Sequence, residues 1–564
     1  MAKQQLAFER FYQKFYYALL ERRPVDASFL GRHEFDGMLP DYSPDGCKRA
    51  ADEIKLQLSE SRSFEEKELN ARQLMDKKLL EGYLETQLWE FSSLHFQKGN
   101  PSLYTGEAIF GMLVCILTDY APAHIRYESM AARMEKFPMF FAQAKGNIQS
   151  APVQWAKRAV NECEGGIVFL RSGLKRAAEK DNCFSMRLQN AAATALCALT
   201  DYKAWLENEL IHSPCENAAA GREAFQLMMQ KAHFADIDLD AYLAYAQAEV
   251  ERATAYLFEH AIDFGAKSPE EALGKLGDIH PSAERYLSRF GEIWDNVEKL
   301  AIENDLVTWP DFPIEYVNQY EWAKECAPYL YFLFYRAPAA FNRPRVMEYL
   351  VPPLRPGEKT PEQTEAFLRA NNDEVIKTNH VVHHGSIGHH VQNYNAYHQE
   401  NSLIGQFAGC DAACRPIMLC AGTMIEGWAV YTTRLIGEFG FLTPLESYAE
   451  MQSHRRMAAR AVVDIKLHCG QFTLEQAAGY YRESACMSEA AAMSEAVKNS
   501  MFPGGGIIYL YGCDVIQHFR KEVEAFKGEK FSIGRFHDDL LSYGSIPVTL
   551  ICEELRCRYG INNK

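Results

Sequence analysis

Five histidines gather within residues 379–392 and form the clearest set of candidate metal ligands in the chain. They are five of the 17 histidines in the sequence: His380, His383, His384, His389 and His390. Neutral imidazole is the commonest metal ligand of proteins near neutral pH. Beside carboxylates further along the chain, this concentration predicts a metal centre. The alternative is a histidine-rich helix whose imidazoles cap and hydrogen-bond one another.

The spacing of these histidines decides which of them can bind the same ion. His380 and His384 are four residues apart and share one face of a straight α-helix. His383 and His389 are six residues apart, and six steps of about 100° turn them to different sides of such a helix. They can converge only if the helix bends at a glycine between them. The glycines in that interval are Gly385 and Gly388.

Carboxylates that could take part follow the histidines. Glu426 lies at the edge of an apolar helix predicted over residues 424–431, where a buried charge needs a partner. A metal would be such a partner, and a salt bridge or helix cap is the simpler alternative. Asp464 and His468 form an i,i+4 pair. That pair could orient a catalytic group or tie one face of a helix.

Two later segments carry further candidate side chains. Residues 503–506 contain consecutive glycines but no Gly-Lys-Ser/Thr, so they predict a flexible turn near a ligand rather than a phosphate-binding loop. Tyr509 and Tyr511 follow this turn, and each is either a catalytic side chain or part of the core. His537 stands alone in residues 536–538, where a single histidine is not diagnostic.

Length and composition predict a soluble globular protein. The chain has 564 residues, of which 48% are hydrophobic and 24% are charged. Its formal net charge of −16 argues against nucleic acids and anionic lipids as partners, although a local basic site is compatible with it. The expected partner is therefore a small-molecule or peptide-like substrate.

The start of the chain and its cysteines indicate a cytoplasmic protein. The first ten residues lack the basic and apolar regions of a secretory signal, and no apolar run reaches transmembrane length. The 15 cysteines are scattered and odd in number, which is typical of reduced thiols in a cytoplasm. Cys410, Cys414 and Cys420 form the only loose cluster, and since their spacing fits no common metal motif we expect them to be structural.

Apolar periodicity predicts a mainly helical fold. Residues 1–120 show the pattern of successive amphipathic helices, and the pattern resumes over 123–210. Residues 303–356 instead contain eight prolines among aromatics, and are the best candidate for short strands that could form one wall of a cleft. No linker or repeat divides the chain. We expect a single large helical domain over 1–564, with the catalytic-like motifs concentrated in 379–547.

Five segments, in order along the chain, carry a family resemblance. They are residues 383–392, 426–431, 460–468, 503–512 and 536–547. They resemble the motifs of a large bacterial family called domain of unknown function 885, whose members look like helical zinc peptidases. In order, the family motifs are His-Glu-x-x-Pro-Gly-His-x-x-Gln, Glu-Gly-Trp-Ala-x-Tyr, Asp-x-x-Leu-His, Tyr-x-x-Gly and Phe-His-Asp. The likeness extends from about residue 70 to the end, and the shared order of the motifs makes it specific.

This resemblance implies both a metal site and a fold. It implies that His383, His389 and Glu426 bind zinc or another divalent transition metal, with the helix broken at Gly388. The bent arrangement is thereby favoured over the straight one. The implied fold is an all-α, metallopeptidase-like scaffold with a central cleft, similar to helical metallocarboxypeptidases.

The sequence departs from the family pattern at two positions. His384 replaces the glutamate after the first histidine, and Ile387 replaces the proline before the glycine. In a hydrolase of this kind the glutamate takes a proton from metal-bound water and returns it to the leaving amine. Histidine can act as a base near neutral pH but brings no negative charge. Because general acid–base help is worth about 10² to 10⁴-fold, ordinary peptidase activity should be severely reduced.

Together these features predict a metal-dependent enzyme that acts on a small organic or peptide-like substrate. The chemistry would be metal-assisted hydrolysis or proton transfer, with His384 as the base and Tyr509 or His537 supporting an oxyanion. The residues expected to contact the substrate are Arg460, His468, Tyr511 and His390. The alternative is a non-catalytic relative that binds a metal or a peptide. A purely structural role is disfavoured by the five retained motifs.

Overall fold

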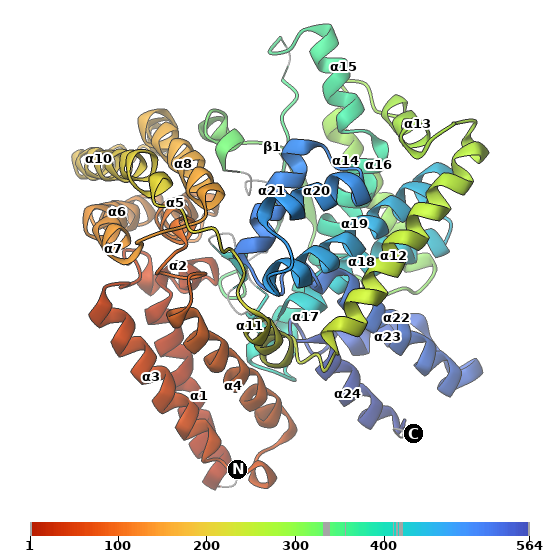
Figure 1. Cartoon of the computed structure of the whole chain (residues 1–564), viewed down its shortest axis with the longest axis horizontal. Helices are drawn as coiled ribbons and strands as arrows, with labels where there is room; N and C mark the ends of the chain where they lie inside the picture. Colours follow the sequence, from red (N-terminus) through yellow and green to blue (C-terminus); the bar gives the residue numbers. More distant parts are fainter. Residues whose placement is uncertain are drawn as a thin grey trace. The chain divides into compact units, whose positions relative to one another are not determined.

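A computed structural model of the chain describes residues 3–330, 339–355, 357–409, 411–412, 415–416 and 421–561. The chain forms two compact units, which are described separately here (Figure 1). Unit 1 comprises Met1–Ala220, Gln319–Pro344 and Asn401–Leu419, and unit 2 comprises Gly221–Asn318, Arg345–Glu400 and Cys420–Lys564. The expectation of a single large helical domain over 1–564 stays a prediction.

Unit 1 is helical and is built around one apolar helix, α5. Its described helices are α1 (Lys3–Arg22), α2 (Pro24–Phe29), α3 (Pro44–Arg62), α4 (Ala71–Ser92), α5 (Pro101–Leu117), α6 (Ala123–Met134), α7 (Phe137–Asn147), α8 (Val153–Val168), α9 (Leu174–Lys180) and α10 (Met186–Asn208). Asn100 caps α5 by accepting a hydrogen bond from the Leu103 N–H, and Pro101 occupies the first turn. Every residue from 103 to 115 of α5 is buried, and the helix packs against α2, α6, α7 and α8. A short antiparallel pair, β3 (Asp411–Ala412) and β4 (Arg415–Pro416), also belongs to this unit.

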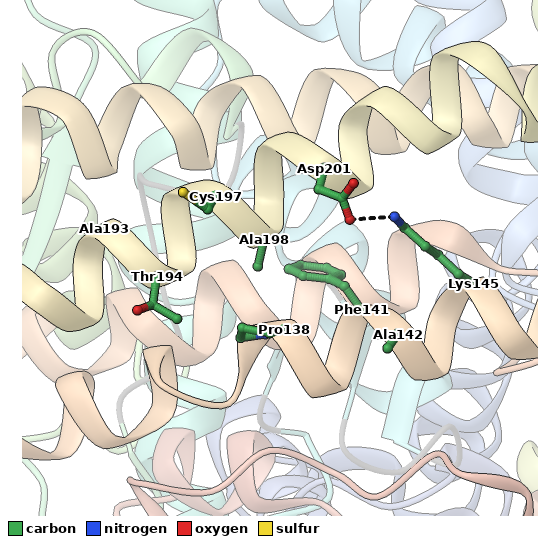
Figure 2. A pocket seen from close by; sticks show the side chains of 9 residues that line it. All are labelled: Pro138, Phe141, Ala142, Lys145, Ala193, Thr194, Cys197, Ala198 and Asp201. Atoms are coloured by element: carbon green, nitrogen blue, oxygen red, sulfur yellow. Dashed lines mark hydrogen bonds and ion pairs between the residues drawn. The ribbon is translucent and has the colours of Figure 1, made fainter.

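An open pocket lies between α7 and α10 of unit 1 (Figure 2). Its lining residues are Pro138, Phe141, Ala142, Lys145, Ala193, Thr194, Cys197, Ala198 and Asp201. The Phe141 ring stacks on Tyr202, with ring centroids 4.5 Å apart. Lys145 and Asp201 form an ion pair of 2.5 Å at one end. None of the site residues predicted from the sequence lines this pocket.

Unit 2 contains every described motif segment. Its elements are α11 (Arg222–Leu227), α12 (Leu239–His260), α13 (Pro269–Gly274), α14 (Tyr286–Glu303), β1 (Ile314–Asn318), β2 (Met347–Val351), α15 (Pro361–Ala370), α16 (Asp373–Val375), the π-helical η10 (Ile376–Gly385), α17 (His389–His398), α18 (Gly422–Glu438), α19 (Pro444–His468), α20 (Leu474–Ala485), α21 (Glu489–Met501), α22 (Ile508–Lys527), α23 (Ile533–Leu541) and α24 (Val548–Tyr559). The largest contacts within the unit join α18 to α22 and α12 to α19.

The long helix α19 starts at a capping box. Thr443 accepts a hydrogen bond from the Glu446 N–H, the Glu446 carboxylate accepts one from the Thr443 N–H, and Pro444 fills the first turn. Both faces of the helix are largely buried because α12 packs on one side and α20, α21 and α22 pack on others. This helix therefore provides a fixed support for the arginines and for Asp464.

Helices α18 and α22 approach so closely that two glycines are required. A Cβ added at Gly512 would lie 2.1 Å from the Thr423 carbonyl oxygen, and one at Gly427 would lie 2.5 Å from the Gly512 carbonyl carbon. Real Cβ atoms essentially never come that close. The contact therefore fixes the segment with Glu426 against the segment with Tyr509.

The prediction of a mainly helical fold is confirmed, and the prediction of short strands within residues 303–356 is confirmed by the parallel pair β1–β2. The aromatic run that continues past residue 330 lies outside the described residues. A central cleft stays a prediction. In the part of the chain that the structure describes, no helix has the length and apolarity needed to cross a membrane.

Candidate metal centre

The histidine segment is two helices joined by a sharp break. The π-helical η10 ends at Gly385, and α17 begins at His389. Across the break, the Gly388 N–H donates a hydrogen bond to the Val382 carbonyl at 3.0 Å. The bend that the sequence required for His383 and His389 to meet is therefore present.

Both glycines of the break are needed because protein atoms occupy the space of a side chain. A Cβ on Gly388 would lie 2.1 Å from the His383 carbonyl oxygen. A Cβ on Gly385 would lie 2.3 Å from the Tyr316 hydroxyl oxygen. Any larger residue at either position would push the chain away from this path.

Two tryptophans bind the carbonyl groups that the break releases from helical hydrogen bonding. Trp428 Nε1 donates to the Ile387 carbonyl at 2.9 Å and to the Gly388 carbonyl at 3.2 Å. Trp294 Nε1 donates to the Gly385 carbonyl at 2.9 Å. Since Trp428 is fully buried and stands two residues after Glu426, it connects the bend to the carboxylate.

The bend brings two imidazoles to one carboxylate. His383 Nε2 lies 3.4 Å, and His389 Nε2 lies 3.6 Å, from Glu426 Oε2. Ligands about 2.0–2.2 Å from a tetrahedral zinc ion are about 3.3–3.6 Å from one another. These separations therefore fit a shared metal ion, which would sit between the three atoms.

A third histidine lies in the same cluster. A ring nitrogen of each of His383, His384 and His389 lies within 4.8 Å of the others, so this triad could hold a metal ion. His384 Nδ1 is 2.7 Å from the Asn379 carbonyl oxygen. Because a carbonyl oxygen can only accept, this contact selects the tautomer in which Nδ1 carries the proton and donates it to that oxygen. The remaining ring nitrogen of His384 is then the candidate ligand or proton carrier.

The electrostatic environment keeps the ligands in the protonation states that metals need. Burial lowers the pKa of His389 to about 4, against the opposing effect of Glu426. Burial also lowers the pKa of His384, and His383 and His389 lower it further. Burial would raise the pKa of Glu426, but its interactions with His383 and His389 outweigh this and lower it. The imidazoles of His384 and His389 are therefore neutral at neutral pH and lie near a deprotonated carboxylate.

The cluster is reached by solvent and contains unsatisfied polar atoms. The Glu426 side chain is 22% exposed and that of His383 is 17% exposed. Glu426 Oε2 and His389 Nδ1 are nevertheless shielded from water and have no hydrogen-bond partner among the described residues. An unsatisfied buried carboxylate oxygen is costly, and a bound cation would compensate for it.

Two further predicted residues lie beside the cluster. The pKa of the Tyr509 hydroxyl is raised, first by burial and then by the neighbouring Glu426 carboxylate, with which it interacts. The Arg460 guanidinium lies 4.7 Å from the centre of the Tyr509 ring. Its Nε donates to the Glu495 carboxylate at 2.8 Å. Tyr509 and Arg460 thus join Glu426 in one polar group.

Other predicted residues contact protein groups elsewhere. His390 Nε2 is 2.6 Å from the Phe312 carbonyl oxygen, and His468 Nε2 is 2.9 Å from that of Asn499. His537 lies between the Tyr431 hydroxyl at 2.7 Å and the Leu306 carbonyl at 2.5 Å. The Tyr511 ring packs against Tyr242, with centroids 5.7 Å apart. The substrate and catalytic roles of these four residues stay predictions.

Asp464 has a role that its pairing with His468 did not indicate. Its carboxylate accepts hydrogen bonds from the backbone N–H groups of Gly504, Gly506 and Ile507, at 3.1, 2.8 and 2.9 Å. Burial raises its pKa to about 7, against these hydrogen bonds. His468 Nε2 is 3.6 Å away. Asp464 therefore fixes the glycine turn from which α22 and Tyr509 begin.

Glu495 and Lys498, both on α21, were missed by sequence reasoning. Lys498 is close enough to Glu426 to contribute to lowering its pKa. Neither residue belongs to one of the five motifs, and no spacing along the chain connects them to Glu426. They reach the site only because α21 packs against α19.

Comparisons with solved structures support the fold. One similar structure is described as "a putative lipoprotein of unknown function from Shewanella oneidensis", with a TM-score of 0.77 and 22% identity, covering 97% of this chain and 99% of that chain. Another is "the putative lipoprotein from Colwellia psychrerythraea", with a TM-score of 0.78 and 16% identity, covering 100% of both chains. At these identities the likeness concerns the fold alone. The comparison with curated proteins gave no match.

The names of these structures contradict the predicted cytoplasmic location, because lipoproteins are anchored to membranes. The prediction depended partly on the cysteines, and the twelve that the structure describes form no disulfide. A chain of this length needs no disulfide in any compartment, so its thiols do not identify one. Cys410, Cys414 and Cys420 lie outside the described residues.

The family resemblance, in contrast, is confirmed over nearly the whole chain. Residues 24–555 match the family described as "Bacterial protein of unknown function (DUF885)". This range contains His383, His389 and Glu426, the bend, both helices of the glycine contact and the turn fixed by Asp464. The chain therefore belongs to this bacterial family of unknown function.

Proposed function

We propose that the chain is a metal-dependent enzyme acting on a small organic or peptide-like substrate, and that His383, His389 and Glu426 hold a divalent transition metal, most readily zinc. The observation that supports this is the convergence of two Nε2 atoms, at 3.4 and 3.6 Å, on a buried carboxylate oxygen that has no described hydrogen-bond partner. Two imidazoles and one carboxylate are a common ligand set of catalytic zinc, which keeps a fourth position for water or substrate.

The side chains around this ligand set suit proton transfer. A bound metal would polarise a substrate oxygen and lower the pKa of a coordinated water. His384, oriented by its hydrogen bond to the Asn379 carbonyl, would accept a proton and return it to the leaving group. Tyr509 keeps its proton because its pKa is raised, so its hydroxyl would donate to a developing oxyanion. Arg460, stacked over the Tyr509 ring, would position that hydroxyl.

The family resemblance suggests descent from zinc peptidases, and His384 suggests a changed reaction. A histidine whose pKa is lowered is neutral at pH 7 and becomes a strong acid once it has accepted a proton. It lacks the charge with which a glutamate would attract a proton from water. Metal-assisted hydrolysis of an activated bond, or proton transfer within a small molecule, therefore fits this site better than hydrolysis of ordinary peptides.

A second candidate is a relative that binds a metal or a peptide without catalysis. It is favoured by the position of His384, whose ring nitrogen lies within 4.8 Å of those of His383 and His389. If His384 occupied the fourth coordination position, the site would be closed, as in structural zinc sites. His384 would then be a ligand and not a base.

Metal content tests the ligand assignment. The full-length protein is loaded with zinc, dialysed, and analysed by mass spectrometry for metal per chain. We expect about one zinc per chain in the wild type and a loss of most of it in Glu426→Gln and His389→Ala. His260→Ala is the matched control, because His260 is partly exposed and pairs with Asp263 in the same unit. Wild-type protein without zinc, or Glu426→Gln with full zinc, would contradict the proposal.

Variants of His384 separate the two candidates. In the enzyme, His384→Ala keeps the zinc, whereas in the closed site it loses the zinc as His389→Ala does. His384→Glu restores the charge of the family's usual base, so we expect it to raise the hydrolysis of a fluorogenic peptide library by about 10²-fold or more over wild type. Zinc-loaded His384→Glu protein without any gain would count against descent from peptidases.

A further inference from the structure

The side chains of residues 536–538 dock α23 onto the segment that follows α14. His537 Nδ1 lies 2.5 Å from the Leu306 carbonyl oxygen. The Asp538 carboxylate accepts hydrogen bonds from the Thr308 N–H at 2.8 Å and from the Thr308 hydroxyl at 2.6 Å. Since a carbonyl oxygen can only accept, the Leu306 contact selects the tautomer of His537 in which Nδ1 carries the proton. The other ring nitrogen, Nε2, is then an acceptor.

Nε2 of His537 is the end of a chain of hydrogen bonds that starts on α22. Arg520 Nη1 donates to the Tyr431 hydroxyl at 3.3 Å, and that hydroxyl donates to His537 Nε2 at 2.7 Å. Arg520 is itself held by the carboxylates of Glu438 and Glu524, each at 2.8 Å. His537 is fully buried, and burial lowers its pKa to about 3, so its ring is neutral and accepts this bond. The direction of each bond in the chain is therefore fixed.

The rings of Tyr431 and His537 both pack against the indole of Trp428. The ring centroids are 5.8 Å apart for Tyr431 and 5.2 Å apart for His537, whose ring meets the indole edge to face. Trp428 binds the Ile387 and Gly388 carbonyls of the bend, and it does so only while its indole keeps this orientation. The chain of hydrogen bonds therefore fixes the two rings that fix the indole.

The same histidine is connected to the second tryptophan that supports the bend. Trp294, on α14, donates to the Gly385 carbonyl at 2.9 Å. The Leu306 N–H donates to the carbonyl of Ala301, in the last turn of α14, at 2.9 Å. By binding the Leu306 carbonyl, His537 ties α23 to the end of that helix. One buried side chain thus links both tryptophan supports.

We propose that Tyr431 and His537 are positioning residues of the metal site, which hold Trp428, and through it the bend, in the geometry that metal binding requires. Metal–ligand distances tolerate changes of only about 0.2 Å, and loss of a residue that orients a ligand typically lowers metal affinity about 10- to 100-fold. A shift of the bend moves His389 relative to Glu426. The effect on metal binding rests on the proposed function, whereas the support of the bend does not.

Tyr431→Phe tests this role with little change of shape. It keeps the ring against Trp428 but removes the donor to His537 Nε2, which is then buried without that bond. We expect the zinc affinity of the full-length protein, measured by competition with a chromogenic chelator, to fall by about 10- to 100-fold. His537→Leu should lower it as far, and the double variant little further, because the two side chains act through one chain.

Tyr448→Phe is the matched control. Tyr448 is another buried tyrosine of unit 2, and its hydroxyl donates to the Leu257 carbonyl. It lies on α19 twelve residues before Arg460, which is about 18 Å along the helix. Its variant should lower the stability in urea as Tyr431→Phe does, but leave the zinc affinity within about threefold of wild type. Equal losses of zinc affinity in the two variants would indicate general destabilisation and overturn the proposal.

Amide hydrogen exchange of the metal-free protein measures the bend independently of zinc. We expect peptides that cover residues 386–392 to exchange at least about fivefold faster in Tyr431→Phe than in wild type, and at the wild-type rate in Tyr448→Phe. Faster exchange in a protein whose wild type binds no zinc would support the network and contradict the proposed function. Zinc bound by the wild type, with either the exchange or the zinc affinity unchanged in Tyr431→Phe, would support the proposed function and overturn the positioning role.

Discussion

Replacing Gly388 by alanine tests whether the bend is what brings the two histidines together. The added Cβ would lie 2.1 Å from the His383 carbonyl oxygen, whereas real Cβ contacts are rarely below 3.0 Å, so the backbone must move by about 1 Å. Metal–ligand distances tolerate a shift of only about 0.2 Å. We therefore expect zinc affinity to fall by about 100-fold or more, the upper end of effects seen when support for a ligand is removed. The free energy of unfolding should fall by about 1–3 kcal/mol.

Competition with a chromogenic chelator measures the zinc affinity, and urea unfolding of the metal-free protein measures the stability. Gly291→Ala is the control, because Gly291 lies within α14 and a Cβ there would have nothing within 4 Å. Alanine inside a helix should be neutral or stabilising by up to about 1 kcal/mol, with zinc affinity unchanged. If Gly388→Ala bound zinc as tightly as the wild type, the bend would not be required and the reasoning would be refuted.

Two further expectations concern buried polar groups that are not themselves proposed as metal ligands. Burial lowers the pKa of His390 to about 4, against its contact with the Phe312 carbonyl, so the folded state binds fewer protons than the unfolded state below pH 6.5. The difference in the free energy of unfolding between wild type and His390→Gln should therefore shrink by about 1.4 kcal/mol per pH unit as the pH falls from about 6.5 to 4. Urea unfolding at several pH values measures this difference, and a difference that does not change with pH would contradict the expectation. Asp464→Asn places a side-chain amide against three backbone N–H donors, so we expect it to lower the free energy of unfolding in urea by about 1–3 kcal/mol. The exposed control Asp263→Asn should lower it little. Equal losses in the two variants would exclude the role of Asp464 in fixing the turn.

Local patterns in the sequence predicted the helical class and the order of the motifs, because apolar periodicity and caps act over a few residues. The alternative pair of His380 and His384 stays a prediction, because η10 is π-helical and four residues there still make nearly one turn. The two side chains make different contacts: His380 Nδ1 lies 2.7 Å from the Tyr349 hydroxyl, and His384 Nδ1 lies 2.7 Å from the Asn379 carbonyl oxygen.

The rest of the site depends on contacts between distant segments, which spacing does not encode. The break between His383 and His389 was predictable as a possibility from its glycines, but its support by Trp294 and Trp428 was not. Likewise, the prolines among aromatics indicated where β1 and β2 would lie, but not how they pair. Their parallel pairing, from Ile314 with Met347 to Asn318 with Val351, depends on contacts between segments far apart in the sequence.

The glycine contact between α18 and α22 makes the ligands unequal in mobility. Glu426 adjoins Gly427, where backbone meets backbone with no side chain between to adjust. His383 and His389 are separated only by a short connection outside regular helix. An ion of larger radius, such as cadmium in exchange for zinc, would therefore be accommodated by turning the imidazoles, while the carboxylate acts as the stationary reference.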